Sequence, residues 1–156
     1  MSTEMTGAAI PSMPCNCAAL REAARYVTQV YDQHVAAAGL RITQYSILAR
    51  LKRLGPMTIN ALAQELVMDR TTLGRNIVPL QREGLIAANR GCDDRRSKEL
   101  HLTKAGLVRL SAAAKGWGKA QAQFEATFGS DRASELRALL RAVVGSGLRT
   151  DSDTFE

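Results

Sequence analysis

Residues 58–86, TINALAQELVMDRTTLGRNIVPLQREGLI, have the clearest structural pattern in this chain. Thr58 is placed to cap one short helix. After a tight break, Asp69 is placed to cap a second, because short oxygen-bearing side chains accept from the free amides at a helix start. Gly84 follows the second helix, and glycine favours a helix stop. Two short helices joined by a tight turn form a helix-turn-helix, which we predict for residues 58–84.

The second helix of this motif has two faces of different chemistry. Apolar residues recur at three- and four-residue intervals on the inward face: Leu73, Ile77 and Leu80. The other face carries residue types that reach base edges and phosphates: Arg70, Thr71, Thr72, Arg75 and Asn76. A recognition helix reads bases with its N-terminal residues, so this face predicts a DNA-binding surface. A solvated polar face on an ordinary helix is the alternative.

A β-hairpin is predicted directly after the motif. Residues 85–89 read as one strand, and residues 99–102 alternate between polar and apolar, as a half-buried strand does. The polar turn between them carries several arginines, and narrow minor grooves attract arginine. One of the acids Asp93 and Asp94 is able to orient an arginine through a charge-assisted hydrogen bond. A soluble loop with local salt bridges is the alternative.

Helical patterns flank this region on both sides, at about 18–38 and 103–148, the second interrupted at Gly129. The first has an apolar stripe from Leu20 to Val35, and the second has a seam from Leu107 to Phe128. Both are too long to be buried by one small DNA-binding core, so a second copy of the chain is expected to cover them. A two-fold dimer predicts a palindromic site with half-sites about one helical turn apart.

Together these patterns predict one domain, residues 15–149, mostly α-helical with a small β-hairpin wing. The winged helix-turn-helix lobe is expected at about 43–102, starting with a helix capped by Thr43, between dimerisation helices. Residues 1–14 and 150–156 lack periodicity and are predicted to be mobile tails.

The net charge of +6 favours an anionic partner, with nucleic acid the first candidate and a membrane surface the second. No apolar run approaches the roughly 18 residues of a membrane span, and no secretory signal is visible. We therefore expect a cytoplasmic protein without a membrane partner. Phosphate loops, metalloprotease helices and nucleophile elbows are missing from the sequence, so we expect no enzyme and no cofactor.

Three cysteines raise the question of metal or redox chemistry. Cys15 and Cys17 are able to bind a metal or respond to an oxidant, but a zinc site needs four ligands and no remaining set is evident. Free thiols without a metal are therefore expected. Cys92 lies among Arg90, Arg95 and Arg96, and neighbouring cations favour a reactive thiolate. Redox sensing through Cys92 is thus an alternative hypothesis.

Five segments of the chain resemble the MarR family of bacterial regulators. They are residues 59–63, 69–73, 80–86, 94–96 and 102–106. The most specific part is Asp-x-Arg in the wing followed by Leu-Thr-x-x-Gly. The resemblance is strong over about residues 40–110, and the outer helices match by pattern only.

This resemblance implies a homodimer with interleaved terminal helices, each recognition helix in a major groove and each wing in the adjacent minor groove. It implies that Arg96 is the wing arginine and Asp94 its orienting partner, with Arg95 beside them. Many members are repressors released by small, often aromatic or anionic molecules, and some respond to cysteine oxidation. Cys92 and Asp93 depart from the common wing pattern.

A ligand pocket is expected between the dimer helices and the DNA-binding lobe. Arg21 is suited to a carboxylate, and the rings of Tyr26, Tyr45 and Trp117 are suited to stacking on an aromatic ligand. Simple packing of these side chains is the alternative. The leading hypothesis is a ligand-released, sequence-specific repressor, and a non-specific DNA-binding protein remains an alternative.

Overall fold

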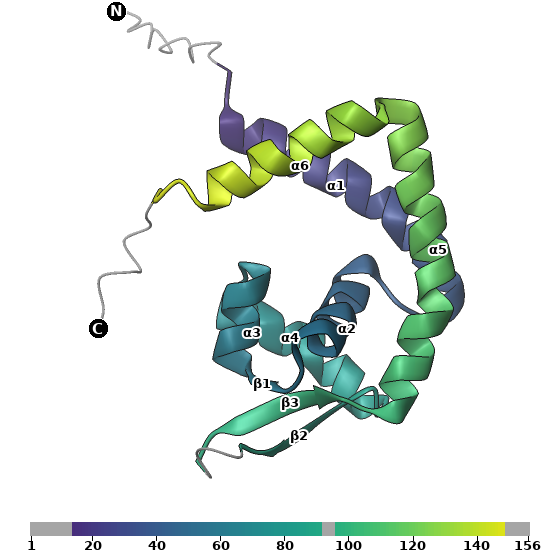
Figure 1. Ribbon diagram of the computed structural model, residues 1–156. Helices are drawn as coiled ribbons and strands as arrows, with labels where there is room; N and C mark the ends of the chain where they lie inside the picture. Colours follow the sequence, from purple (N-terminus) through teal and green to yellow (C-terminus); the bar gives the residue numbers. More distant parts are fainter. Residues whose placement is uncertain (1–13, 92–95, 149–156) are drawn as a thin grey trace, which may run out of the picture.

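The computed structural model describes residues 14–91 and 96–148, which form a winged helix-turn-helix flanked by long helices (Figure 1). Along the chain the elements are α1 (Asn16–Val35), a 3-10 turn η1 (Ala36–Ala38), α2 (Ile42–Leu54), β1 (Met57–Thr58), α3 (Ile59–Leu66), α4 (Arg70–Arg82), β2 (Ile86–Arg90), β3 (Lys98–Leu102), α5 (Lys104–Phe128) and α6 (Ser130–Val144). The predicted fold class, mostly α-helical with a small hairpin wing, is confirmed.

Helices α2, α3 and α4, the sheet and one face of α5 enclose one apolar core, to which α5 contributes Leu110 and Ala113. We call residues 40–102 the lobe. Its large buried side chains are Leu40, Ile47, Leu48, Leu51, Leu62, Leu73, Ile77, Leu80, Leu85, Ile86 and Leu100. The sheet is antiparallel with strand order β1-β3-β2. Strands β2 and β3 with the residues between them are the wing.

Strand β1 was not predicted from the sequence. It has only two residues, Met57 and Thr58, which pair with Leu100 and Glu99 of β3. Two residues are too few to show the alternation that marks a strand. Strand β1 is therefore defined by its pairing with β3, a segment about forty residues later in the chain.

Helix starts in the lobe are mostly set by local capping. The predicted caps Thr58, Asp69 and Thr103 are confirmed, since each side chain accepts from a backbone N–H three residues later. The prediction of a cap at Thr43 is wrong, because α2 already starts at Ile42. The amide of Ile42 donates to the carboxylate of Asp32 at 2.7 Å, a partner on another helix.

The long helix α5 runs from the lobe to α6, which lies at the opposite end of the molecule, and α1 packs against α5 (Figure 1). It crosses α1 closely at Gly116, where an added Cβ would lie 2.0 Å from the carbonyl oxygen of His34. The crossing is reinforced by Tyr31, whose hydroxyl donates to Gln121 Oε1 at 2.6 Å. The predicted tails lie outside the described residues apart from Pro14, so their mobility stays a prediction.

Substitution of Gly116 tests the helix crossing. Gly116→Ala is expected to lower the free energy of unfolding by roughly 1–3 kcal/mol, because the added methyl overlaps the backbone of α1. Gly118→Ala is the matched control, since an added Cβ there meets no atom within 4 Å. It should be neutral or stabilise by up to about 1 kcal/mol. Chemical denaturation at fixed protein concentration measures both, and equal effects would contradict the close crossing.

The carboxylate of Asp69 holds the first turn of α4. It accepts from the backbone amide and the side-chain hydroxyl of Thr72. These bonds, the side-chain one first, lower the pKa of Asp69 below its usual 3.8. A lowered folded-state pKa means that the ionised cap stabilises the fold above the unfolded-state pKa, and that this contribution disappears as pH falls through the folded-state value.

A comparison of Asp69 with a neutral cap tests this assignment. Asp69→Asn keeps a capping acceptor but has no charge, so it should melt below the parent protein at neutral pH. The difference in melting temperature should vanish once the parent carboxylate is protonated, well below pH 3.8. Thermal unfolding followed across this pH range checks it. An unchanged difference at acid pH would show that the charge plays no part.

Candidate nucleic-acid interface

Helix α4 presents one face to the core and the opposite face to solvent. Leu73, Ile77 and Leu80 are buried. The solvent face carries a row at intervals of four, three and four residues, and every member is exposed: Thr71, Arg75, Val78 and Arg82. Val78 and Arg82 were not predicted as part of this face, although their helical spacing from Thr71 and Arg75 was a usable signal.

The predicted DNA-contacting residues of α4 differ in the exposure and hydrogen bonding of their side chains. Arg70, Thr71 and Arg75 are exposed, and no hydrogen bond within the described chain engages their side chains. Asn76 is half-buried, and its Nδ2 donates to the carbonyl oxygen of Thr72 at 2.9 Å. The hydroxyl of Thr72 donates to Asp69. The first three side chains are therefore the ones best placed to meet a ligand.

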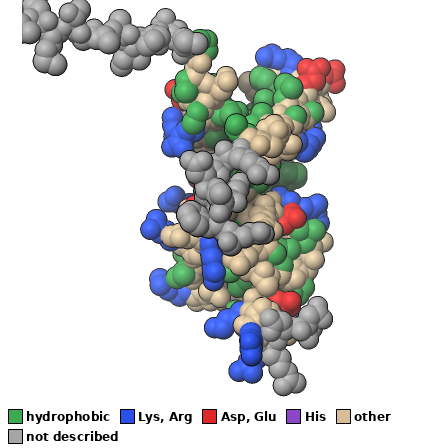
Figure 2. All heavy atoms as spheres, turned by 90° about the vertical axis from the view of Figure 1, so that its left-hand side faces the viewer, with side chains coloured by type: hydrophobic (Ala, Val, Ile, Leu, Met, Phe, Trp, Pro, Cys, Tyr) green, Lys and Arg blue, Asp and Glu red, His purple; other side chains and the backbone are tan. Residues whose placement is uncertain are grey.

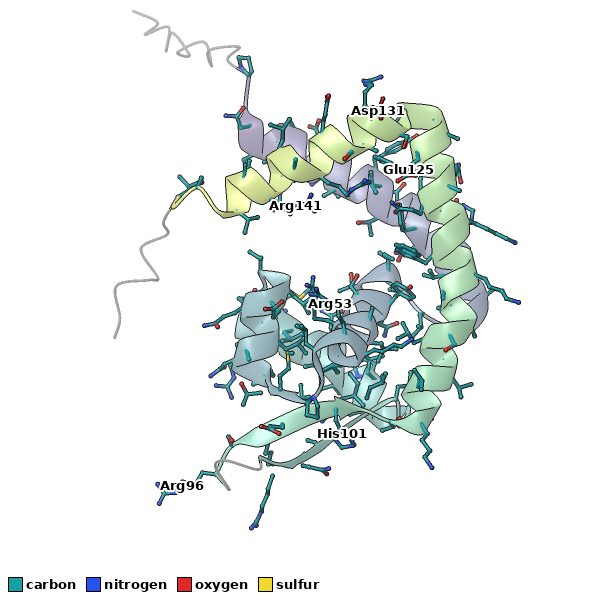
Figure 3. All side chains as sticks on the ribbon, in the orientation of Figure 1. Arg53, Arg96, His101, Glu125, Asp131 and Arg141 are labelled. Carbon is teal, nitrogen blue, oxygen red and sulfur yellow. The ribbon has the colours of Figure 1, made fainter. Side chains whose placement is uncertain are left out.

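The wing extends from the rest of the lobe as a two-stranded ribbon. Arg90 and Lys98 face each other at the outer end of the β2–β3 pairing. Arg96 is exposed and projects away from the body of the molecule (Figure 3). Cys92, Asp93, Asp94 and Arg95 lie outside the described residues, so the predicted orientation of Arg96 by Asp94 and the redox role of Cys92 stay predictions.

Positive charge accompanies these surfaces. Figure 2 shows Lys and Arg side chains along one edge of the lobe and on the wing below it. Within residues 14–91 and 96–148, ion pairs engage Arg50, Arg53, Arg109 and Arg137, and none engages Arg70, Arg75 or Arg82. Cations without a carboxylate partner attract phosphate without first breaking an ion pair.

The end of α4 is joined to the start of α5 by a compact set of contacts. The hydroxyl of Thr103 donates to the Gly84 carbonyl at 2.6 Å, and its amide donates to the Leu85 carbonyl at 3.1 Å. Gly106 packs so closely that a Cβ would lie 2.1 Å from the same Leu85 oxygen. Arg109 pairs with Glu83 at 3.1 Å. The orientation of α4 is thereby tied to that of α5.

The structure brings together two of the four predicted ligand residues. The rings of Tyr45 on α2 and Trp117 on α5 are stacked, with centroids 6.1 Å apart and planes inclined by 13°. Burial raises the pKa of Tyr45. Arg21 and Tyr26 are exposed on α1, and no described contact joins them to this pair.

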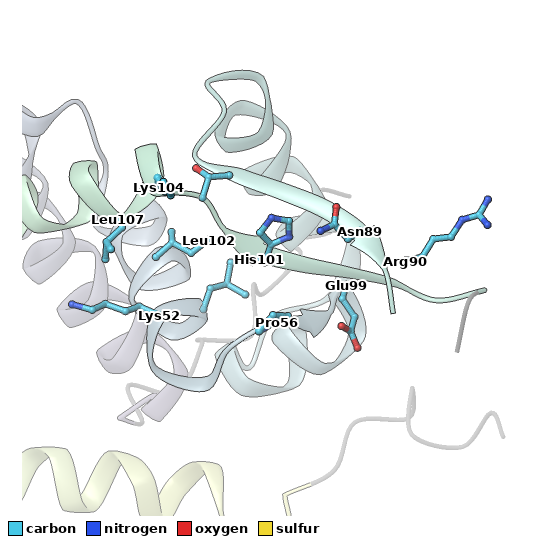
Figure 4. A pocket seen from close by; sticks show the side chains of 11 residues that line it. Lys52, Pro56, Asn89, Arg90, Glu99, His101, Leu102, Lys104 and Leu107 are labelled. Carbon is cyan, nitrogen blue, oxygen red and sulfur yellow. The ribbon is translucent and has the colours of Figure 1, made fainter. Parts of the chain in front are cut away.

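Two surface cavities lie elsewhere. One, of about 640 Å³, lies between the end of α2, the outer face of the sheet and the start of α5, with His101, Glu99 and Lys52 in its lining (Figure 4). The other, of about 540 Å³, lies between η1, Glu83 and α5. Neither is lined by any of the four predicted ligand residues.

The remaining candidate groups have simpler surroundings. Cys15 and Cys17 are exposed free thiols at the start of α1, and Cys15 Sγ accepts from the amide of Ala18 at 3.4 Å. The part of the chain that the structure describes contains no group of three or more metal-ligating side chains. It also contains no helix of the length and hydropathy needed to cross a membrane.

Comparisons with known proteins agree with this geometry. Residues 40–98 match the model of the MarR family, and no curated protein matches the chain significantly. The transcriptional regulator MosR of M. tuberculosis, solved in complex with DNA, is 33% identical with a TM-score of 0.73, over 86% of this chain and 100% of that chain. The transcriptional repressor CouR, bound to a 23-mer DNA duplex, is 25% identical with a TM-score of 0.76, over 83% and 92%.

A further solved structure shares the fold at lower identity. The PcaV transcriptional regulator of Streptomyces coelicolor, in complex with its natural ligand, is 20% identical with a TM-score of 0.77, over 91% of this chain and 100% of that chain. The family model covers most of the lobe, and the one-third-identical regulator extends the match over the flanking helices. The chain therefore belongs to the MarR family of transcriptional regulators.

Proposed function

We propose that this protein binds duplex DNA sequence-specifically, with α4 in a major groove and the wing in the adjacent minor groove. The observation that carries the proposal is the exposed row of Thr71, Arg75 and Arg82 on α4, whose arginines have no ion-pair partner in the described chain. Arginine in a major groove is suited to guanine, and threonine to phosphate or a thymine methyl. The DNA complexes of MosR and CouR support this assignment.

We further propose that the active form is a homodimer. Helices α1 and α6 leave large apolar side chains open to solvent in the single chain: Leu20, Tyr26, Leu139, Leu140, Val143 and Val144. A surface of this kind is typical of an interface between subunits. A two-fold dimer would set the spacing of the two α4 helices and require a palindromic DNA site.

The regulatory outcome that we propose is repression released by a small anionic aromatic ligand. Trp117 is 38% exposed, so one part of its ring is free while another stacks on Tyr45. Arg21 and Tyr26 are exposed on α1. In a dimer, the second copy would bring its own Arg21 and Tyr26 to the stacked pair. CouR is a repressor, and the PcaV regulator shares the fold and holds a ligand, which supports this reading.

Binding to the DNA upstream of the protein's own gene tests the main proposal. A specific regulator should bind that duplex about 10³-fold or more tightly than a scrambled one. Affinity for both should fall as the salt concentration rises. Fluorescence anisotropy at two salt concentrations measures this. A duplex selected from random sequences serves as a second specific candidate. If neither it nor the upstream duplex binds more tightly than the scrambled duplex, and all three bind in a salt-sensitive way, the result would instead support a non-specific DNA-binding protein.

Two arginine substitutions separate the roles of α4 and the wing. Arg75→Ala should weaken binding to the specific duplex by about ten-fold or more and to scrambled DNA much less. Arg96→Ala should weaken binding to both and reduce the salt slope by about one, with a smaller loss of selectivity. Lys115→Ala is the control, because Lys115 is an exposed cation on α5. An unchanged affinity of the Arg96 variant would remove the wing from the proposal.

The single tryptophan provides a direct assay for the ligand site. Trp117 is the only tryptophan in the chain, so quenching of its fluorescence reports a ring that binds beside it. With benzoate and neutral benzamide as probes, Arg21→Ala should weaken benzoate binding and leave benzamide binding unchanged, because only benzoate has a carboxylate. DNA affinity without ligand should also stay unchanged. Equal binding of benzoate by parent and variant would remove Arg21 from the site.

A further inference from the structure

Gly74 lies in the middle of α4, and nothing within the described chain requires a glycine there. At Gly106 and Gly116 an added Cβ would come within 2.1 Å and 2.0 Å of a backbone oxygen, so those positions have no room for a side chain. At Gly74 an added Cβ would meet no atom within 4 Å. Because glycine destabilises a helix interior relative to alanine, the open space at Gly74 has a cost that folding does not explain.

The residue four positions later on the same helix is Val78, an apolar side chain that is 50% exposed. Side chains on a helix lean toward its N-terminus and cover the turn before their own, so Val78 leans toward Gly74. Because Gly74 has no side chain, nothing at position 74 covers the helix backbone beside Val78. The result is a bare stretch of backbone beside an exposed valine, which we call the Gly74–Val78 step.

The step lies on the face proposed to meet DNA. Thr71 and Arg75 belong to the same exposed row as Val78, and Arg82 continues the row one turn later. The arginines provide charge for phosphates and donors for guanine, but the step itself has only apolar groups to offer. Its partner in a major groove must therefore be an apolar group on a base edge, and the 5-methyl group of thymine is the one that unmodified DNA provides there.

We propose that the Gly74–Val78 step takes up the methyl group of a thymine and so makes each half-site selective for thymine at one position. This inference rests on the proposed function, because it needs α4 in the major groove. Gly74 leaves the room for the methyl, and Val78 contacts it. Alanine at position 74 would fill that room without disturbing the protein itself.

The test uses the duplex that the parent dimer selects from a random-sequence library. Each thymine of its half-site is replaced in turn by deoxyuridine, which removes the methyl and keeps the base-pairing edge. One position should weaken binding by the parent about four-fold per half-site, as expected for one buried methyl group. Gly74→Ala and Val78→Ala should bind the thymine duplex more weakly and respond little to deoxyuridine at that position.

Gly118→Ala is the matched control, since it adds the same methyl at another open position outside α4. It should keep the full response to deoxyuridine, and thermal unfolding should show all three variants folded. Three results would overturn the inference while leaving specific binding intact. The selected half-site has no recurring thymine, or no thymine position responds to deoxyuridine, or the two α4 variants respond to deoxyuridine as strongly as the parent does. Failure to select any duplex would overturn the proposed function together with it.

Discussion

The end of α4 and the start of α5 are held together by backbone contacts that set how the lobe and the long helix are arranged. Thr103 bonds the carbonyls of both Gly84 and Leu85 while it caps α5. Gly106 has no side chain, so the first turn of α5 packs directly on the backbone of Leu85, the residue before β2. Helices α4 and α5 therefore meet at one closely packed corner, so a change in the direction of α5 is carried to α4.

The far end of α5 is joined to its neighbours in a different way. Tyr31 on α1 donates to Gln121, which donates to Glu125, and Glu125 pairs with Arg137 on α6. These groups are partly exposed, so each link is modest in strength. Backbone packing joins α5 to the lobe and, at Gly116, to α1, and the polar side chains add a link from α1 through α5 to α6.

Features set by neighbouring residues were predictable from the sequence, and those set by distant residues were not. Thr58, Asp69 and Thr103 cap helices through atoms three residues away, so local spacing sufficed. Thr43 was not the cap because α2 already starts at Ile42, whose amide donates to Asp32 on another helix. The chemistry of α4 was visible in its composition, but the open space at Gly74 depends on what surrounds it.

The short strand β1 connects the wing to the helix-turn-helix. Thr58 ends β1 and caps α3, while β1 is paired with the wing strand β3. The wing and the helix-turn-helix are thus braced against each other, and in the proposed DNA complex they would set the distance between two grooves. In that complex the duplex would have to adapt to this spacing, so base pairs that no side chain touches would affect affinity through the energy needed to bend them.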